Sequence, residues 1–247
     1  MLPPLHRSIE EAGFNSLPSI QTLLYDGWLI RLAGGGPKRA NSVNVLTASA
    51  IPFAQKIRYC EQLFQQQGLP LTFRLTDHPQ NLELDACLER EGLQRIDDSL
   101  VLVKQLDHPT ASTALELHQS DAETWFSQMM LLDQGSPERK QKHVELLKRL
   151  ALPAVYGGMQ TGEGHAAIGL AVIDGDYAGI FDINTNPVLR RRGHARALMT
   201  GLLDEARQHG ARTAYLQVTA SNMPAIGLYE SLGFVPAYRY WYRCSAA

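Results

Sequence analysis

Three consecutive arginines, Arg190 to Arg192, are followed by Gly193 and stand between two segments of different character. Residues 177–185 before them have the apolar pattern of a β-strand, and residues 192–208 predict a helix with an apolar stripe. The first N–H groups of a helix lack intrahelical partners, and the helix dipole favours an anion there. Glycine permits close approach of the backbone, and arginine adds charge and forked donors. The stretch predicts a phosphate-binding turn; a solvated basic turn is the alternative.

A second group of residues follows the predicted strand at residues 213–218. Asn222 precedes a predicted helix from Pro224 to Leu232, which contains Tyr229 and which Gly233 ends. By itself Tyr229 is equally compatible with a packed aromatic side chain in the core. These two groups must be positioned by the elements around them, so the rest of the chain decides how they are interpreted.

Length, composition and net charge restrict the class of protein. The chain has 247 residues, of which 45% are apolar and 19% charged, and its net charge is −2. These values predict a globular protein with one or two domains, and give no reason to expect nucleic acid or a membrane surface as partner. The three cysteines are far apart and fit neither a disulfide framework nor a metal site. With no secretory signal and no long apolar run in the sequence, we expect a cytoplasmic protein.

Periodicity and turn residues predict alternating helices and strands throughout. In the first half the expected elements are helices at 8–16, 52–67 and 82–91 and strands at 28–32, 42–46, 71–75 and 99–103. In the second half they are helices at 121–133, 137–150, 192–208 and 224–232 and strands at 115–117, 154–159, 167–173, 177–185, 213–218 and 234–242. We therefore expect two domains, 1–106 and 114–247, joined by a polar linker at 107–113.

The two halves end alike, which indicates an internal repeat. Gly68 ends a helix as Gly210 does, 142 residues later, and Gly92 corresponds to Gly233 at an offset of 141. The positions that match the arginine turn are residues 48–51, which contain no arginine or glycine. The first copy is thus expected to lack the anion site and to be structural, or to shape an acceptor pocket.

Together the two groups resemble the GNAT superfamily of acyl-CoA-dependent N-acetyltransferases. The family pattern Arg/Gln-x-x-Gly-x-Gly/Ala is matched by Arg190, Gly193 and Ala195, and the segment from Asn222 to Phe234 is similar to the later Asn and Leu-Tyr…Gly-Phe segment. The match covers about residues 115–247, and the first half resembles a degenerate copy. The resemblance implies an α/β (α+β) fold of two GNAT-like units, each a mixed, mostly antiparallel sheet flanked by helices.

The resemblance also implies where acetyl-CoA would bind. The backbone of Ile183, Asn184 and Thr185 would pair with the pantetheine arm, and the N–H groups of residues 191–197 would hold the pyrophosphate. Tyr229 would protonate the departing thiolate, because a neutral phenol can give up its proton as charge develops. The implied cofactor-binding set is Ile183, Asn184, Thr185, Arg190, Arg191, Arg192, Gly193, His194, Ala195, Arg196, Ala197, Asn222, Ala225, Leu228 and Tyr229.

Two residues depart from the usual family pattern, and one residue is the leading candidate for a catalytic base. Ala195 replaces the commoner glycine, and His194 is bulkier than the usual apolar residue. Asp182 is the leading candidate for the base that takes the amine's proton, through water, while a solvated strand residue is the alternative. Glu163 and His165 are weaker candidates for that base.

The implied function is transfer of an acetyl group from acetyl-CoA to an amine, directly in a ternary complex. A non-catalytic acyl-CoA-binding or sensory module is the alternative, and an interaction scaffold is a third class. The acceptor is a small-molecule or peptide amine, whose pocket residues 34–39 and 129–139 would border. No metal is expected, and the chain would be a monomer or a homodimer.

Overall fold

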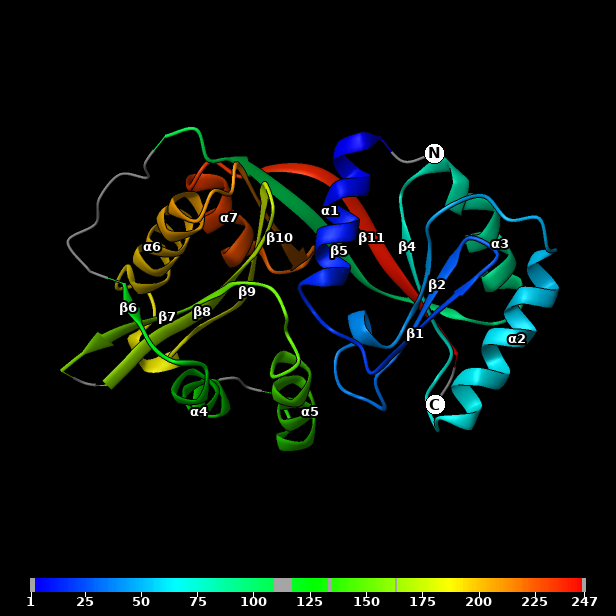
Figure 1. The fold of residues 1–247 in the computed structure, drawn as a ribbon, viewed down its shortest axis with the longest axis horizontal. Helices are drawn as coiled ribbons and strands as arrows, with labels where there is room; N and C mark the ends of the chain where they lie inside the picture. Colours follow the sequence, from blue (N-terminus) through cyan, green and yellow to red (C-terminus); the bar gives the residue numbers. More distant parts are fainter. Residues whose placement is uncertain (1–2, 109–116, 133–134, 163, 246–247) are drawn as a thin grey trace.

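The computed structural model describes residues 3–108, 117–132, 135–162 and 164–245 (Figure 1). Within them the strands form one eleven-stranded sheet in the order β1-β2-β3-β4-β11-β5-β10-β9-β8-β7-β6. Neighbouring strands are antiparallel except for β3 with β4 and β9 with β10. The predicted residues 109–113 of the linker, and residues 115–116 of the predicted strand at 115–117, lie outside the described residues.

The first half of the chain contributes three helices, two short 3₁₀ turns and five strands. They are α1 (Pro4–Asn15), β1 (Gln21–Tyr25), β2 (Trp28–Leu32), η1 (Lys38–Ala40), β3 (Val43–Val45), α2 (Phe53–Gln66), β4 (Thr72–Thr76), η2 (Pro79–Asn81), α3 (Leu82–Arg90) and β5 (Gln94–Gln105). Two details differ from the sequence prediction. The edge strand β1 was not predicted, and α1 begins at Pro4, whose fixed φ suits a first helical position, rather than after Ser8.

The second half contributes four helices, one 3₁₀ turn and six strands in the described residues. They are β6 (His118–Gln119), α4 (Ala122–Leu132), α5 (Pro137–Leu147), β7 (Ala154–Thr161), β8 (Gly164–Asp174), β9 (Tyr177–Thr185), η3 (Pro187–Leu189), α6 (His194–Gln208), β10 (Thr213–Thr219), α7 (Met223–Ser231) and β11 (Val235–Cys244). The predicted order of these helices and strands is confirmed, with ends that differ by a few residues.

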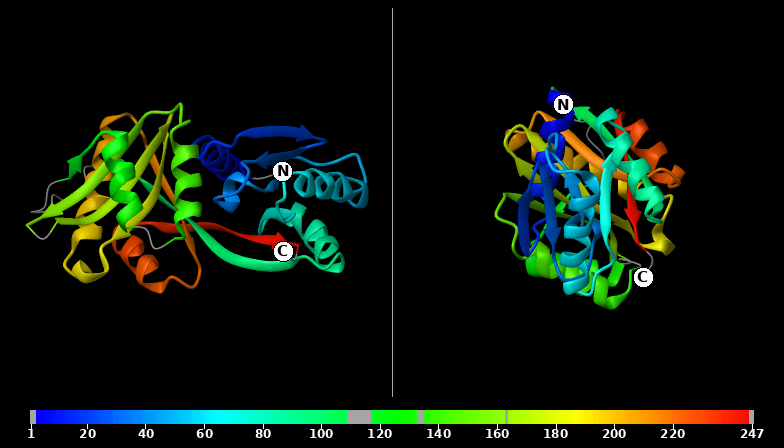
Figure 2. Two further views of the ribbon diagram at one scale, coloured as in Figure 1. Left: turned by 90° about the horizontal axis from the view of Figure 1, so that it is seen from below. Right: turned by 90° about the vertical axis from the view of Figure 1, so that its right-hand side faces the viewer.

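The last strand of each half bonds to the other half. β5 pairs along Ser99–Gln105 with β10, and β11 pairs along Tyr240–Cys244 with β4. β5 and β11 also pair with each other, and both run from one half into the other (Figures 1 and 2). The two units therefore share one sheet instead of closing two separate ones.

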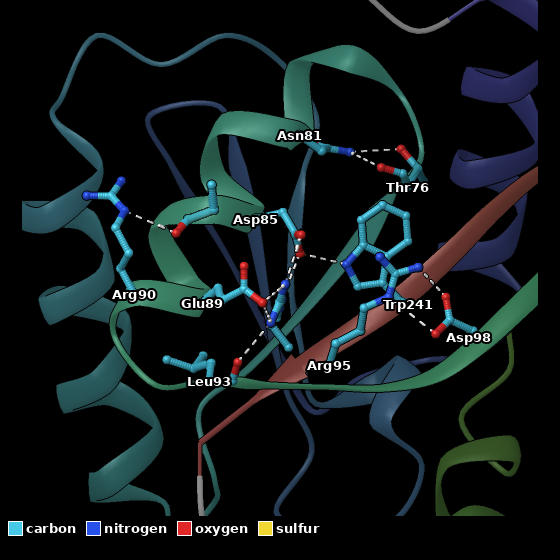
Figure 3. Close-up of polar contacts among 11 residues, drawn as sticks. Thr76, Asn81, Asp85, Glu89, Arg90, Leu93, Arg95, Asp98 and Trp241 are labelled. Atoms are coloured by element: carbon cyan, nitrogen blue, oxygen red, sulfur yellow. Dashed lines mark hydrogen bonds and ion pairs between the residues drawn. The ribbon is translucent and has the colours of Figure 1, made fainter.

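Polar side chains fix β11 in the first half. Asp85 on α3 accepts a hydrogen bond from Trp241 Nε1 at 2.7 Å (Figure 3). It accepts another from Arg243 Nε at 2.8 Å. The guanidinium of Arg95 lies 3.9 Å from the Trp241 ring centroid and is also bonded to Asp98. Arg243 is almost fully buried, so its ion pair with Asp85 is shielded from water and holds β11 in register with the first half.

Three apolar clusters hold the layers together. The first packs α6 and α7 against one face of the second-half strands, and the second packs α1, α4 and α5 against the opposite face. The third lies between α2, α3 and the first-half strands. Because α1 belongs to the second cluster, where Ser16 Oγ lies 3.1 Å from Tyr215 Oη, the N-terminal helix also joins the halves.

Candidate active site

The site is built around the place where β9 and β10 part. Their parallel register ends at the pair Ile180–Leu216. Beyond it, Asn184 and Thr185 of β9 pair with β8 on the other side, and residues 217–219 of β10 pair with β5. Each strand therefore presents a backbone edge toward the gap between them. Such edges can pair with an extended, amide-containing chain.

A bulge in β9 places Asp182 in this gap. Ile168 faces Asn184 and Leu170 faces Phe181, so Asp182 and Ile183 together oppose Gly169. Asp182 has a φ of 53°, in the left-handed region that non-glycine residues rarely adopt. A Cβ atom at Gly169 would lie 2.4 Å from Ile183 Cδ1 and 3.0 Å from Leu202 Cδ1, so a larger residue opposite the bulge would force these packed side chains to move.

Four of the predicted site residues line one cavity, whereas Asn184, Thr185, Ala225 and Leu228 are not part of its lining. Its volume is about 330 Å³, and its lining includes Asp182, Ile183, Asn222 and Tyr229 together with residues of β10. This size is in the usual range for small-ligand pockets, about 300–1,000 Å³. Tertiary structure thus brings Asp182 and Ile183 beside Asn222 and Tyr229, about forty residues later in the sequence, while the arginine turn does not line this cavity.

Tyr229 is buried at 8% exposure, and its ring packs against Phe234 with centroids 6.2 Å apart. Burial raises the pKa of its phenol to about 12. Its hydroxyl has no hydrogen-bond partner in the described part of the chain. The phenol is therefore protonated at neutral pH and has a donor available for a ligand.

Asp182 is paired with a histidine that no sequence motif indicated. His143 of α5 is 8% exposed, and its Nε2 lies 2.8 Å from Asp182 Oδ2. Burial of Asp182 opposes its ionisation, but the charge and hydrogen bond of His143, aided by Arg39 and Arg139, outweigh it and lower the carboxyl pKa. Asp182 is thus a persistent negative charge in the cavity.

The predicted phosphate turn begins α6. Gly193 is its N-cap with a φ of 84°, and Arg190, Arg191 and Arg192 are exposed. In the first turn of a helix the N–H groups have no intrahelical acceptor, which leaves those of residues 194–196 available. The N–H of Ala197 already donates to the Gly193 carbonyl at 3.0 Å.

Other predicted site residues have structural partners. Arg196 donates from Nη2 to Ser231 Oγ at 2.6 Å and so connects the start of α6 to α7. Asn222 caps α7 by accepting from the Ala225 N–H at 3.3 Å, and Leu228 packs against the first apolar cluster. His194 is buried rather than exposed.

The corresponding turn of the first half already holds a carboxylate. Asp26 accepts from the N–H groups of Ala50 and Ile51, at 3.0 and 2.8 Å, just before α2. These backbone bonds are the main reason that the pKa of Asp26 is lowered. In the first half, a carboxylate of the chain itself therefore binds the turn that corresponds to Arg192 and Gly193.

A second cavity of about 480 Å³ shares part of this lining and reaches the first half of the chain. Pro37, Lys38 and Arg39 line it from the first half, and Arg139 and His143 line it from α5. The two stretches expected to border an acceptor pocket, 34–39 and 129–139, therefore each supply lining residues.

Among the described residues, no three His, Cys, Asp or Glu side chains gather closely enough to hold a metal ion. No helix in that part of the chain combines the length and apolar character needed to cross a membrane.

The chain is similar to known proteins along almost its whole length. Residues 6–243 match the family described as "Probable histone acetyltransferase Rv0428c C-terminal". The chain is 26% identical over 245 residues to the uncharacterized N-acetyltransferase YobR of Bacillus subtilis, covering 96% of this chain and 97% of that protein.

Solved structures show the same fold. A GCN5-related N-acetyltransferase from Kribbella flavida superposes with a TM-score of 0.71 at 13% identity, covering 98% of this chain and 95% of that one. A tandem GNAT protein from the clavulanic acid biosynthesis pathway superposes with a TM-score of 0.66 at 16% identity, covering 97% and 88%. The chain belongs to the Rv0428c-like family of GNAT N-acetyltransferases and has the tandem fold, as its repeat and its arginine turn predict.

Proposed function

We propose that this protein transfers an acetyl group from acetyl-CoA to a primary amine, directly and in a ternary complex. The observation that carries the proposal is the single cavity lined by Asp182, Ile183, Asn222 and Tyr229 where β9 and β10 part. A carboxylate, a protonated phenol and two backbone edges in one cavity suit an acyl transfer. The duplicated domains, 1–106 and 114–247, act together as one catalytic unit.

The second half carries the residues that fit acetyl-CoA. The free edge of Ile183–Thr185 is suited to the amides of the pantetheine arm, and the turn at Gly193 with its arginines is suited to the pyrophosphate. When bound, acetyl-CoA supplies an acetyl thioester whose C–S bond breaks as the amine forms its C–N bond. Asp26 fills the matching turn of the first half, which argues for one cofactor per chain.

The side chains divide the proton movements between them. Asp182 attracts the ammonium form of the acceptor, and a proton passes from the nitrogen through water to solvent, since a carboxylate with a lowered pKa holds protons weakly. Tyr229 donates its phenol hydrogen bond toward the leaving sulfur and hands over the proton as the thiolate forms. Positioning of the two reactants in one cavity supplies much of the acceleration.

The experiment measures acetyl-CoA binding by calorimetry and thiol release with a panel of amines. We expect Arg192→Glu and Gly193→Pro to weaken acetyl-CoA binding at least tenfold, because the first removes a cation and the second cannot adopt the φ of 84°. Arg149→Glu, an exposed arginine outside both cavities, is the matched control.

The outcomes separate the classes of function. Unchanged affinity in both variants would sink the cofactor assignment. Binding without thiol release from any amine would instead indicate an acyl-CoA-binding or sensory module. The family description names a histone acetyltransferase, so a lysine-rich peptide belongs in the panel beside small amines and peptide N-termini.

A further inference from the structure

The larger cavity beside the catalytic residues is built by both halves of the chain. Pro37, Lys38 and Arg39 come from the loop and 3₁₀ turn before β3, and Arg139 comes from α5. The two segments are close, because a Cβ atom at Gly36 would lie 3.1 Å from the Cβ of Lys142. Any acceptor that reaches Asp182 through this cavity therefore meets cationic side chains from two separate parts of the sequence.

Within the described residues, only some of the charged side chains that line this cavity are paired with an opposite charge. Of the three cations that line the cavity, Lys38 is paired with Asp97 at 2.9 Å. Arg39 and Arg139 have no carboxylate partner for their guanidinium groups in the described part of the chain. Asp182 is the remaining carboxylate, and its Oδ2 is bonded to His143 while no hydrogen bond occupies its Oδ1 in the same described residues.

Arg39 is held in place without being neutralised. Its guanidinium carbon lies 4.9 Å from the ring centroid of Phe181, and its carbonyl accepts a hydrogen bond from Arg31 Nη1 at 2.8 Å. Its Nη1 atom is buried and has no hydrogen-bond partner among the described residues. A buried donor without an acceptor is unfavourable, so the guanidinium group of Arg39 is not satisfied by the described residues themselves. Stacking on the residue next to Asp182 also keeps this cation beside the carboxylate.

From this arrangement we infer that the acceptor is a small amine bearing a carboxylate or phosphate next to its amino group. Arg39 and Arg139 would take the anion, and Asp182 Oδ1 would take the ammonium. Arg39 would thus be a specificity residue supplied by the half that lacks a cofactor site. The inference rests on the proposed function for the transfer itself, but the recognition of charge can be measured without it.

The transfer to such an acceptor is balanced. The amino group loses one proton to solvent before attack and a second after its bond to the acetyl carbon forms. The sulfur leaves with the electron pair of the C–S bond and takes one proton from Tyr229, which recovers it from solvent. The products are the N-acetylated amine, free thiol and one proton, with no oxidant or reductant needed.

The test compares matched acceptors by calorimetry in the absence of acetyl-CoA. The pairs are L-phenylalanine with L-phenylalaninamide and O-phosphoethanolamine with ethanolamine, and a lysine-rich peptide is added. We expect the anionic member of at least one pair to bind more tightly by about 10- to 150-fold, the value of one hydrogen-bonded charge in a partly buried site. The pair that responds identifies the anion as carboxylate or phosphate. Equal or absent binding of both anionic members, or tighter binding of the peptide, overturns the inference.

Variants connect the preference to the residues. Arg39→Gln and Arg139→Gln are each expected to weaken binding of the member that carries the carboxylate or phosphate about tenfold or more, and to leave binding of its partner without that anion unchanged. Arg58→Gln, on the exposed face of α2, is the matched control. Loss of the preference in the control, or its persistence in both cavity variants, contradicts the assignment. If acetyl-CoA turnover occurs only with amines that carry no anionic group, the proposed function stands and this inference is wrong. If the charge preference is found without acetyl-CoA binding, this inference stands and the proposed function is wrong.

Discussion

Tyr229→Phe removes one oxygen atom from the centre of the proposed mechanism and little else. The hydroxyl has no hydrogen-bond partner in the described part of the chain, and the ring stays packed against Phe234. We therefore expect a change in unfolding free energy below about 0.5 kcal/mol. We expect the affinity for acetyl-CoA to change less than threefold, because the hydroxyl acts on the sulfur only as charge develops.

The loss of turnover can be estimated from the environment of the phenol. A hydrogen bond to a charged group is worth about 1.5–3 kcal/mol, and each 1.36 kcal/mol is a factor of ten, so kcat should fall about 10- to 150-fold. The pKa of about 12 lies two units above the ordinary value of 10, so ionising this buried phenol costs about 2.7 kcal/mol more than in water. The donor should therefore remain protonated, and the kcat profile should show no alkaline limb from this residue below about pH 11.

The assay follows thiol release at saturating acetyl-CoA and acceptor, with affinity measured separately by calorimetry. Tyr59→Phe, in the half-buried Tyr25–Tyr59 contact on the outer side of the first half, is the matched control and should keep wild-type kcat. Wild-type kcat in Tyr229→Phe would refute the donor role. An equal loss of affinity and kcat would show that the hydroxyl supports binding in general rather than the leaving sulfur.

Three further predictions concern the frame around the site. Gly169→Ala should destabilise the fold by about 1–3 kcal/mol in urea unfolding, because its Cβ would lie 2.4 Å from Ile183 Cδ1, whereas Gly162→Ala, with open space around it, should not. Arg243→Ala should cost about 1.5–3 kcal/mol because the partly buried carboxylate of Asp85 on α3 loses its ion pair and keeps only the hydrogen bond from Trp241, while the exposed Arg90→Ala stays within about 0.5 kcal/mol; equal losses would contradict the role given to Arg243 in holding β11. Because the pKa of the Asp182 carboxyl is lowered, the carboxylate stabilises the fold above about pH 3.9, and this stabilisation is lost as the pH falls through the folded pKa. Asp182→Asn should therefore flatten the acid side of the pH–stability curve. An unchanged slope would contradict this.

The sequence determined the features that depend on neighbouring residues. The start of α6 beside Gly193 and the place of Tyr229 within α7 follow from local turn and helix-forming residues, so short motifs predict them, whereas the capping of α7 by Asn222 was not predicted. The tandem arrangement also followed from sequence, because the repeat offset reflects two copies of the same order of elements. The family and the fold can be recognised from the sequence because each turn, helix end and strand has its own residue pattern.

Tertiary structure alone decided the partners of those features. His143 is paired with Asp182, and Arg39 faces the same cavity from more than 140 residues away, because the bulge, α5 and the η1 turn converge there. No pattern in α5 distinguishes a histidine that meets a carboxylate from one that faces solvent.

The exchange of β5 and β11 is likewise invisible in the sequence. Every strand offers the same backbone donors and acceptors along its edges, so hydrogen bonding by itself does not select β10 or β4 as a partner. The choice is made by side chains distant in sequence, such as Asp85 with Arg243, which become neighbours only when the sheet is complete. The residues proposed to take part in the chemistry are thus recognisable from local patterns, and the cavity in which they meet is set by which strands pair.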